Sequence, residues 1–436
     1  MKRITCKFGG SSLADAGCIC QALGIIRANP ERRFIVASAP GKRTADDKKI
    51  TDLLYAWHSI ARQGLDASEP RRIIETRFSE LAGELKVTFD IDRHLREIAE
   101  LAGAFEAPDF MASRGEYLNS RLIAEALGAA FVDPADCIKF KSSGELDPAS
   151  YDLLGARLQG EGLFVVPGFY GSMPDGAIRT FSRGGSDVTG SIVARAAKSE
   201  MYENWTDVTG FRMADPRIVP NAKRIEEVTY KELRELAYMG ATVLHDEAIF
   251  PVITAGIPIH IRNTKDPDAI GTMIVPERES HAPVCGIAGH AGFTMINIEK
   301  TLMNKEKGFG LRVLSVFDEF GVNWEHIPTG IDTMSLILRD QELKGNADAI
   351  MEALQKRVSP DEMTITTGLA MIATVGQGMN HHVGVAARLT AALAEASVNI
   401  RVIDQGSSEM NIIIGVEEGD LKAAIQAIYE AFDSWS

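Results

Sequence analysis

The stretch Ile4-Thr-Cys-Lys-Phe-Gly-Gly-Ser-Ser-Leu13 decides the fold of this chain. Its apolar, β-prone first half predicts a strand ending at Lys7, and its glycines predict a turn into a helix over residues 13–27. Glycines let backbone N–H groups approach an anion, a helix start adds partial positive charge, and a lysine adds a full one. The stretch therefore indicates a phosphate site. The alternative is an ordinary strand–helix turn with an exposed lysine, since Lys7 precedes the glycines and the G-x-x-x-x-G-K-[ST] loop is not matched.

Length and composition limit the class of protein. A chain of 436 residues has room for roughly two to four domains, and 45% apolar with 24% charged residues is ordinary for a globular protein. A net charge of −14 disfavours nonspecific binding to nucleic acid or anionic membranes. No apolar run is long enough to span a membrane, and no signal-peptide core follows Met1. The five scattered cysteines suit free thiols, so we expect a cytoplasmic protein.

Strand patterns alternate with longer helical patterns as far as residue 275. The predicted strands are 33–39, 129–133 and 162–167, and the predicted helices fill 50–107 and run from Ser113 to Gly128. This alternation predicts the α/β class, as a three-layer sandwich around a mainly parallel sheet. Ligands of such folds bind at the carboxyl ends of strands, where the glycine-bearing loops of this chain fall.

The pattern changes at residue 276. A polar, proline-flanked linker over 276–283 precedes two units, 284–366 and 367–436, that repeat a β-α-β-β-α-β order. The second unit lacks a last strand, and we expect Val284–Ala288, within 284–292, to fill that edge. The predicted strands are 293–298, 322–325, 334–338 and 363–366 in the first unit, and 371–375, 398–403 and 410–416 in the second. The predicted helices open at Gly308 and cover 346–357, 383–396 and 421–432.

Further motifs carry a family resemblance. They are Phe181-Ser-Arg-Gly-Gly-Ser-Asp-Val-Thr189, Trp205-Thr-Asp-Val-Thr-Gly210 and Ala214-Asp-Pro-Arg217. With Lys7-Phe-Gly-Gly-Ser-Ser12 they resemble, in order, the motifs of the aspartate kinases within the amino-acid kinase superfamily. The two C-terminal units resemble paired ACT domains, ferredoxin-like modules that bind amino acids. The likeness covers nearly the whole chain and implies an amino-acid kinase fold followed by two ACT domains.

The resemblance implies an ATP- and Mg²⁺-dependent kinase that converts L-aspartate to 4-phospho-L-aspartate. Such a reaction requires that the phosphates be held, their charge neutralised and the acceptor aimed in line. By the family match Lys7 bridges phosphate oxygens, and Asp187 orients Lys7 or Mg²⁺. The alternative for Asp187 is an N-cap for a helix starting at Val188. The implied ATP contacts are Lys7, Phe8, Gly9, Gly10, Ser11, Gly184, Gly185, Thr206, Asp207, Arg212 and Arg217.

Aspartate carries two carboxylates and an ammonium, so its pocket should contain a cation and an acid. Arg183 can bind a carboxylate in bidentate fashion, and Glu116 can hold the ammonium. The alternative for Glu116 is a solvated residue in the first turn of a helix opening at Ser113. The implied substrate contacts are Ser38, Thr44, Glu116, Phe169, Arg183 and Ser186.

The nucleotide segment departs from the family pattern at two positions. Arg212 stands where many members have a tyrosine, and Thr242 stands where many have a lysine in the stretch Gly240-Ala-Thr-Val-Leu-His245. We therefore expect nucleotide placement to depend on Arg212 and Arg217, and we expect His245 to be a packed helix residue.

Two segments of the first regulatory unit, Lys307-Gly-Phe-Gly-Leu311 and Val322–Gly330, resemble the effector loop of lysine-inhibited aspartate kinases. Glu325 falls where an acid meets the effector's amine; the alternative is an exposed glutamate at a strand end. The implied effector contacts are Gly308, Phe309, Gly310, Asn323, Trp324, Glu325 and Thr329. ACT modules pair across subunits, which implies a homodimer or homotetramer. Lysine is therefore the expected allosteric inhibitor, and the choice between lysine, threonine or both stays open.

Two other functions compete with this interpretation. A different amino-acid kinase, such as a glutamate 5-kinase, is disfavoured by the ACT-like tail and by Ser113-Arg-Gly-Glu116. A non-catalytic amino-acid sensor is disfavoured because Lys7, Glu116, Arg183 and Asp187 are all present. Cys18-x-Cys20 and His381-His382 lack further ligands at metal spacing, so no side-chain metal site is predicted. The expected reaction is the first step of lysine, threonine and methionine biosynthesis.

Overall fold

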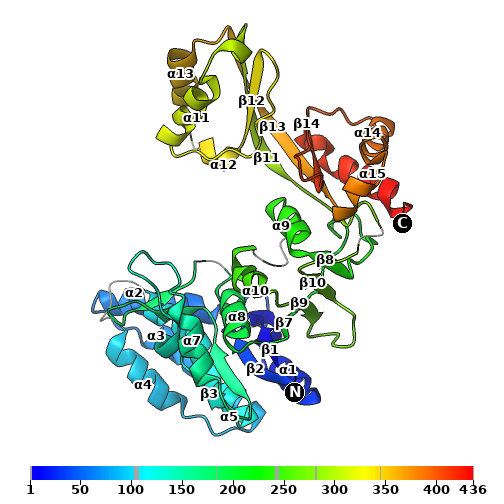
Figure 1. Ribbon diagram of the computed structural model, residues 1–436. Helices are drawn as coiled ribbons and strands as arrows, with labels where there is room; N and C mark the ends of the chain where they lie inside the picture. The colour runs from blue at the N-terminus through cyan, green and yellow to red at the C-terminus, as the bar shows by residue number, and fades with distance from the viewer. Residues whose placement is uncertain are drawn as a thin grey trace. The chain divides into compact units, whose positions relative to one another are not determined.

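The computed structural model describes residues 2–102, 108–182, 184–240, 244, 246–279, 282–343 and 345–435 (Figure 1). Packing divides the chain into two compact units, each taken by itself below. The first unit comprises Met1–Phe211, Glu226–Tyr230 and Val243–Arg278. The second comprises Arg212–Ile225, Lys231–Thr242 and Glu279–Ser436. Two short stretches that precede residue 275 thus pack with the C-terminal part of the chain.

The first unit is built on an eight-stranded sheet in the order β3-β4-β2-β1-β7-β9-β10-β8. Its neighbouring strands run parallel, except that β9 and β10 pair antiparallel. The strands are β1 (Ile4–Phe8), β2 (Arg32–Ala37), β3 (Ala130–Phe131), β4 (Phe164–Pro167), β7 (Met201–Thr206), β8 (Glu227–Thr229), β9 (Ile259–Asn263) and β10 (Thr272–Val275). A separate hairpin joins β5 (Tyr170–Ser172) to β6 (Ile178–Thr180).

Strand β2 shows that helices cover both faces of this sheet. Ile35 and Ala37 belong to a core formed with helices α1 to α5, whereas Phe34 and Val36 belong to a second core formed with α7 and α8. Successive side chains of a strand point to opposite faces, so the two cores lie on opposite sides. The expected three-layer sandwich is confirmed. The helices are α1 (Ala16–Ala28), α2 (Ile50–Arg62), α3 (Ser68–Leu85), α4 (Ile91–Leu101), α5 (Asp109–Leu127), α6 (Pro134–Cys137), α7 (Ala149–Arg157), α8 (Gly185–Ala196) and α10 (Phe250–Ala255).

Two predicted helix starts were wrong. The helix expected from Leu13 is a 3-10 turn, η1 (Gly10–Leu13), followed by α1, because the Asp15 side chain caps α1 by accepting a 2.8 Å hydrogen bond from the Cys18 N–H. The helix expected from Ser113 already begins at Asp109. Within the described residues, no helix has the length and apolar character that crossing a bilayer requires.

The second unit contains a five-stranded antiparallel sheet in the order β12-β11-β13-β15-β14. Helices α11 and α13 pack at one end of it, and α14 and α15 at the other (Figure 1). Its strands are β11 (Gly286–Glu299), β12 (Thr333–Arg339), β13 (Glu362–Val375), β14 (Val402–Asp404) and β15 (Asn411–Glu417). Its helices are α9 (Tyr230–Tyr238), α11 (Phe309–Glu319), α12 (Asp340–Leu343), α13 (Ala347–Val358), α14 (Val385–Glu395) and α15 (Leu421–Asp433). The first residue of α9, Tyr230, is assigned to the first unit, and the rest of the helix to the second.

The two repeats share their central strands. Residues 286–289 of β11 pair with 372–375 of β13, which is the edge where the sequence placed this stretch. The separate strands expected at 363–366 and 371–375 are instead one 14-residue strand, β13. Gly292 (φ +93°) and Gly368 (φ +71°) adopt left-handed backbone near the register shifts, so the pair bends without ending.

The two expected β patterns that begin with Val-Asn were also wrong. Residues 322–325 form no strand, and pairing with β12 is limited to isolated bridges at His326 and Thr329. The strand expected at 398–403 is reduced to β14. Pro328 cannot donate to a sheet ladder, which accounts for the interruption near the first of these segments.

Candidate active site

Lys7 is held by an acid that comes from the other glycine motif. It lies on β1 beside Asn204 of β7, and only 7% of its surface is exposed. Its Nζ lies 2.6 Å from Oδ1 of Asp187, and the Asn204 side-chain amide donates to the same oxygen at 2.8 Å. Burial and this pairing rule out the alternative of an exposed lysine. The Lys7 side chain is therefore fixed in position near the end of strand β1.

Asp187 is not the N-cap of its helix. Helix α8 begins at Gly185 with Gly184 as N-cap, so Asp187 lies inside the first turn and the alternative assignment was wrong. An acid in the first turn suits the positive end of the helix dipole. Both described contacts of its carboxylate, from Lys7 and Asn204, go to Oδ1.

The glycines of both turns are required by close backbone approach. A Cβ on Gly10 would lie 3.0 Å from the Ala39 carbonyl oxygen, and the Gly10 carbonyl itself accepts a 2.8 Å hydrogen bond from the Gly41 N–H. A Cβ on Gly185 would lie 2.3 Å from the ring of Phe169, which itself adopts φ +84°. A non-glycine residue in left-handed backbone is uncommon and costs free energy. The loop bearing Phe169 is therefore pressed against the start of α8.

Glu116 is buried on α5, and 7% of its surface is exposed. Since it is inside the helix, the alternative of a solvated first-turn residue was wrong. Burial raises the pKa of Glu116 to about 7, against the opposing effect of a hydrogen bond from the Ala39 backbone. Its Oε2 has no hydrogen-bond partner among the described residues. A buried carboxyl with an unpaired oxygen is suited to receive a cationic group.

One cavity of about 240 Å³ brings these groups together. It is lined by Lys7, Gly9, Gly10, Ser38, Thr51, Glu116, Phe169, Gly184, Gly185, Ser186 and Asp187. Ten of these eleven residues were expected in the site; Thr51 was not. The cavity thus combines an ammonium, the starts of two helical turns, hydroxyl groups and two carboxyl groups.

Several predicted contacts lie elsewhere in the described structure. Phe8 is a core residue stacked on Trp205 with ring centroids 6.0 Å apart. Ser11, Thr44 and Asp207 are exposed and do not line the cavity. Thr206 ends β7. Arg183, Thr242 and His245 lie outside the described residues.

The two nucleotide arginines belong to the second unit. Arg212 donates to the Ala222 carbonyl at 2.7 Å, and Arg217 forms a 2.6 Å ion pair with Asp215. Their roles toward a nucleotide stay predictions.

Sequence reasoning missed Thr51 and Asn204, although both left a signal. Thr51 is polar but shares a helix face with the buried Leu54, three residues on. Asn204 interrupts an otherwise strand-forming run, and asparagine is depleted in strands. Polar residues at positions that a pattern assigns to the core deserve notice as candidates for a site.

The residues present fit a magnesium ion held chiefly by phosphate. Among the described residues, no group of three or more His, Cys, Asp or Glu is placed to bind a metal. Mg²⁺ commonly keeps several waters and is bound through one or two carboxylates plus substrate phosphates. Oδ2 of Asp187 is a suitable oxygen in the cavity for that purpose.

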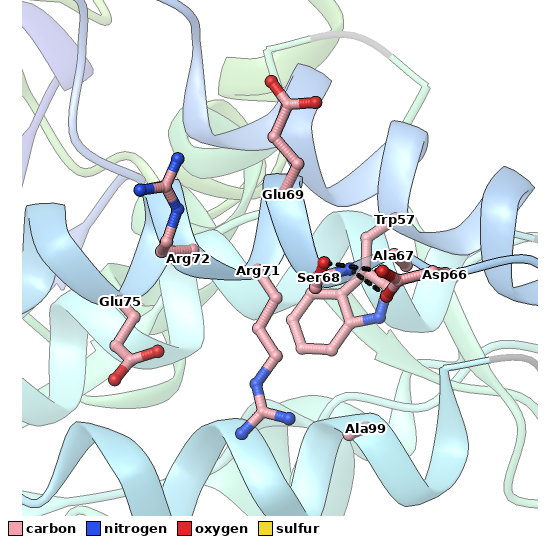
Figure 2. A pocket seen from close by; sticks show the side chains of 9 residues that line it. All are labelled: Trp57, Asp66, Ala67, Ser68, Glu69, Arg71, Arg72, Glu75 and Ala99. Carbon is pink, nitrogen blue, oxygen red and sulfur yellow. Dashed lines mark hydrogen bonds between the residues drawn. The ribbon is translucent and has the colours of Figure 1, made fainter.

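A larger cavity in the first unit lies among helices α2, α3 and α4 (Figure 2). Its volume is about 590 Å³, and Arg71 and Arg72 point to different sides of it. Asp66 accepts hydrogen bonds from the Ser68 N–H and hydroxyl, both at 2.9 Å. No residue of either glycine motif lines it, so it is not the candidate active site.

The effector-like segment of the second unit contains one member of an ion pair whose acid is shielded from solvent and whose arginine is partly exposed. Glu325, whose side chain is 7% exposed, binds Nε of Arg339 through Oε1 at 2.6 Å. The alternative of an exposed glutamate at a strand end was therefore wrong. Nη2 of Arg339 also donates to the Tyr238 carbonyl at 3.2 Å, and its guanidinium lies 5.1 Å from the Tyr238 ring centroid. Burial and the Glu325 carboxylate raise the pKa of Tyr238 to about 12.

The other residues predicted to bind the effector lie near this pair in sequence but differ in exposure. Gly308 is the N-cap of α11 with φ +76°, and Phe309 is buried. Trp324 is 47% exposed, and Asn323 is also exposed. Gly310 is partly buried in the first turn of α11, and the exposed Thr329 donates to the Ile327 carbonyl at 3.1 Å. Effector binding by this set stays a prediction.

Comparison with known proteins places the chain among kinases of amino acids. Residues 2–263 match the amino acid kinase family, and residues 372–432 match an ACT domain. Aspartokinase 3 of Bacillus subtilis is 40% identical, with 98% of each chain covered. The crystal structure of Clostridium acetobutylicum aspartate kinase superposes with a TM-score of 0.91 at 45% identity, covering 99% of this chain and 100% of that one.

A more distant solved enzyme has been seen with ligands. Escherichia coli aspartokinase III, 27% identical and matched over 99% of this chain and 100% of its own, superposes with a TM-score of 0.76 in a complex with aspartate and ADP. In a complex with lysine and aspartate, with the same identity and coverage, its TM-score is 0.74. The two complexes are described as R-state and T-state, respectively.

Proposed function

The chain belongs to the amino acid kinase family and, within it, to the aspartokinases, and we propose that its cavity transfers the γ-phosphoryl group of ATP to the side-chain carboxylate of L-aspartate. One observation carries this proposal: a single cavity holds the Lys7–Asp187 pair, both glycine turns and the buried Glu116. The product is 4-phospho-L-aspartate.

Each group in the cavity has a role that suits phosphoryl transfer. The aspartate carboxylate attacks the γ-phosphorus, the bond from that phosphorus to the bridging oxygen breaks, and ADP leaves with the electron pair. Lys7 neutralises charge on the transferring group, and Asp187 with Asn204 holds the ammonium in place. The Gly9 N–H donates to the Trp205 carbonyl at 3.1 Å, so the N–H groups of Gly10, Gly184 and Gly185 bind phosphate oxygens. Magnesium, when bound with the nucleotide, neutralises phosphate charge.

Substrate recognition in this proposal depends on complementary charge. Ionised Glu116 binds the ammonium of aspartate, and Arg183 binds its α-carboxylate. Ser38 and Ser186 line the cavity and supply hydroxyl groups, while Phe169 closes one wall. Thr44 serves the same site from the loop after β2. We keep Thr206, Asp207, Arg212 and Arg217 as predicted nucleotide contacts; none of them lines this cavity.

The test is an assay for ADP with aspartate, glutamate and N-acetylglutamate as acceptors, each with ATP and Mg²⁺. We expect turnover with aspartate only. Turnover with glutamate and none with aspartate would assign another amino-acid kinase activity. Tight binding of an amino acid without any turnover would assign a sensor.

We further propose that lysine inhibits the enzyme through Glu325 and the segments around Gly308 and Asn323. The lysine complex of Escherichia coli aspartokinase III supports this choice of effector, and the carboxylate of Glu325 suits a basic one. The ACT units then pair across subunits in a homodimer or homotetramer. In the cell the enzyme acts in the cytoplasm, at the first step toward lysine, threonine and methionine. Inhibition assays with lysine and threonine, singly and together, identify the effector, and light scattering gives the oligomer size.

A further inference from the structure

A buried arginine outside the cavity connects the loops that form it. Arg77 of α3 is 3% exposed. Its Nη2 donates to the carbonyls of Ala14 and Gly41 at 2.6 Å and 2.8 Å, and its Nη1 pairs with Oδ2 of Asp47 at 2.5 Å. Three groups from two separate segments are therefore held by one planar guanidinium.

Both segments adjoin residues that line the cavity, namely Gly10 and Ser38. Ala14 directly follows η1, the turn that starts at Gly10, and Gly41 bonds back to Gly10 through its own N–H. The loop from Pro40 to Asp47 follows Ser38, a cavity residue. Asp47 also accepts hydrogen bonds from the backbone and side chain of Arg43, at 3.0 Å and 3.2 Å, which closes the loop on itself.

We propose that Arg77, with Asp47, is a positioning residue that couples the Gly9–Gly10 turn to the loop from Pro40 to Asp47. This inference rests on the proposed function of the cavity. Arg77 and Asp47 do not line the cavity, so they act through the backbone of Gly10, Gly41 and Ser38 rather than by touching a reacting atom. Small displacements of substrate-positioning loops reduce rates strongly, because the reacting groups lose alignment.

Arg77→Met removes all three contacts, Arg77→Lys keeps the charge but not the fork, and Asp47→Asn removes one charge while keeping the shape. Arg93→Met is the matched control, since Arg93 forms an exposed helical ion pair with Glu97. For Arg77→Met we expect kcat/KM for aspartate to fall about 100-fold, and for Asp47→Asn about tenfold, with Arg77→Lys in between. The control should match wild type.

Calorimetry separates positioning from plain stabilisation. Wild type should bind ADP more tightly when aspartate is present, and Arg77→Met should lose that enhancement while remaining folded by circular dichroism. Variants that are less heat-stable but keep wild-type kinetics and the enhancement would overturn the proposal. If Arg77→Met does not fold, Arg77→Lys and Asp47→Asn decide the question. If the wild-type protein has no aspartate kinase activity, the proposed function is refuted rather than the role of Arg77. In that case the role of Arg77 is tested by ADP binding alone, which should be weaker in the variants than in wild type.

A separate observation in the second unit concerns the Glu325–Arg339 pair. The carboxylate proposed to bind the effector's amine already contacts an internal cation at 2.6 Å, and Oε2 of Glu325 is buried without a hydrogen-bond partner among the described residues. Arg339 also binds the carbonyl of Tyr238, the last residue of α9. Helix α9 starts at the residue that follows β8 of the kinase sheet.

We infer that Arg339 is an internal competitor for Glu325, which a cationic effector must displace, and that its displacement frees the end of α9. This inference deepens the proposed lysine inhibition and depends on it. The ion pair then has two effects: it weakens lysine binding by competition, and it transmits that binding to α9, which follows β8 in the chain. Breaking the pair should therefore change binding and inhibition in opposite directions.

The test compares lysine binding and lysine inhibition in Arg339→Met. The buried carboxylate loses its internal partner, so we expect the lysine Kd to fall about tenfold while the maximal inhibition decreases. Arg357→Met is the control, because Arg357 pairs with Glu319 on an exposed face. Weaker lysine binding in a folded Arg339→Met protein would overturn the inference. If that variant fails to fold, Arg339→Gln is measured in its place. If neither wild type nor the variant binds lysine, the proposed effector is refuted. If lysine binds to the variant but not to wild type, the competition between Arg339 and lysine is supported.

Discussion

Two buried glutamates, each expected to receive the amino group of an amino acid, differ in their partners. In the first unit, Glu116 has no hydrogen-bond partner for Oε2 among the described residues, and the cation nearby, Lys7, is bound by Asp187. In the second unit, the cation lies on the glutamate itself, where Arg339 binds Oε1 of Glu325.

In the roles proposed above, this difference separates a substrate site from a sensing site. A buried carboxyl that has an unpaired oxygen and no cationic partner gains much from a ligand's ammonium, so its pocket binds without competition from an internal cation. A carboxylate that already has an arginine partner shares its charge with that arginine, so a ligand's ammonium competes with the existing contact. Such competition weakens binding but links it to a change elsewhere, as regulation requires.

The largest effect should come from breaking the cation arrangement of the first unit. Lys7→Met removes the only ammonium among the described residues that line the cavity, and we expect kcat to fall by about 10³-fold or more, as when a cation that stabilises phosphoryl transfer is lost. Steady-state assays measure this. Lys141→Met, which removes an exposed lysine of the same unit, is the control. Turnover within a few-fold of wild type would remove Lys7 from the mechanism.

Glu116→Gln tests the unpaired carboxyl. Loss of a charge-assisted hydrogen bond should lower kcat/KM for aspartate roughly 10- to 100-fold. Because only ionised Glu116 attracts an ammonium and its pKa is about 7, wild-type kcat/KM should rise with pH through about 7, and the variant should lack that limb. Glu125→Gln, on the exposed side of the same helix, is the control. An unchanged pH profile in Glu116→Gln would contradict the assignment.

Ionisation of Glu116 should lower the free energy of unfolding as pH rises, whereas ionisation of a carboxyl with a depressed pKa raises it. The folded pKa of Glu116 is raised, so ionising it opposes folding, and its cost grows as pH rises from about 4.5 to about 7. The unfolding free energy of Glu116→Gln relative to wild type should therefore increase between pH 5 and pH 8. Denaturant titrations at the two pH values measure it, and a decrease would mean that Glu116 is paired in solution.

Among these variants, Glu325→Gln should have the smallest effect, and it should act on lysine inhibition. The amide cannot attract the effector's ammonium as a charge does, so the lysine concentration for half-inhibition should rise about tenfold. Dose–response assays against Glu319→Gln, an exposed glutamate of α11, measure it. An unchanged half-inhibition concentration would place lysine elsewhere.

Much of the fold and site could be predicted because the signals are local. Glycine turns after strands, period-two alternation and helical spacing belong to short stretches, so the sandwich, both glycine motifs and most of the cavity lining were expected. Helix and strand limits were less predictable. Asp109 begins α5 and β13 runs through two expected strands, because tertiary burial of α5 and pairing of β13 with β11 extend elements beyond their local signals.

The sequence by itself determined the parts: a phosphate turn at Lys7–Ser12, a second one at Gly184–Asp187, and acids at 116 and 325. Only the tertiary structure decided which cation meets which acid. Lys7 reaches Asp187 because β1 lies beside β7 and α8 packs on both, and Arg339 reaches Glu325 across the sheet edge. Charge pairing acts over a few ångströms, and residues far apart in the sequence come that close only when the layers pack.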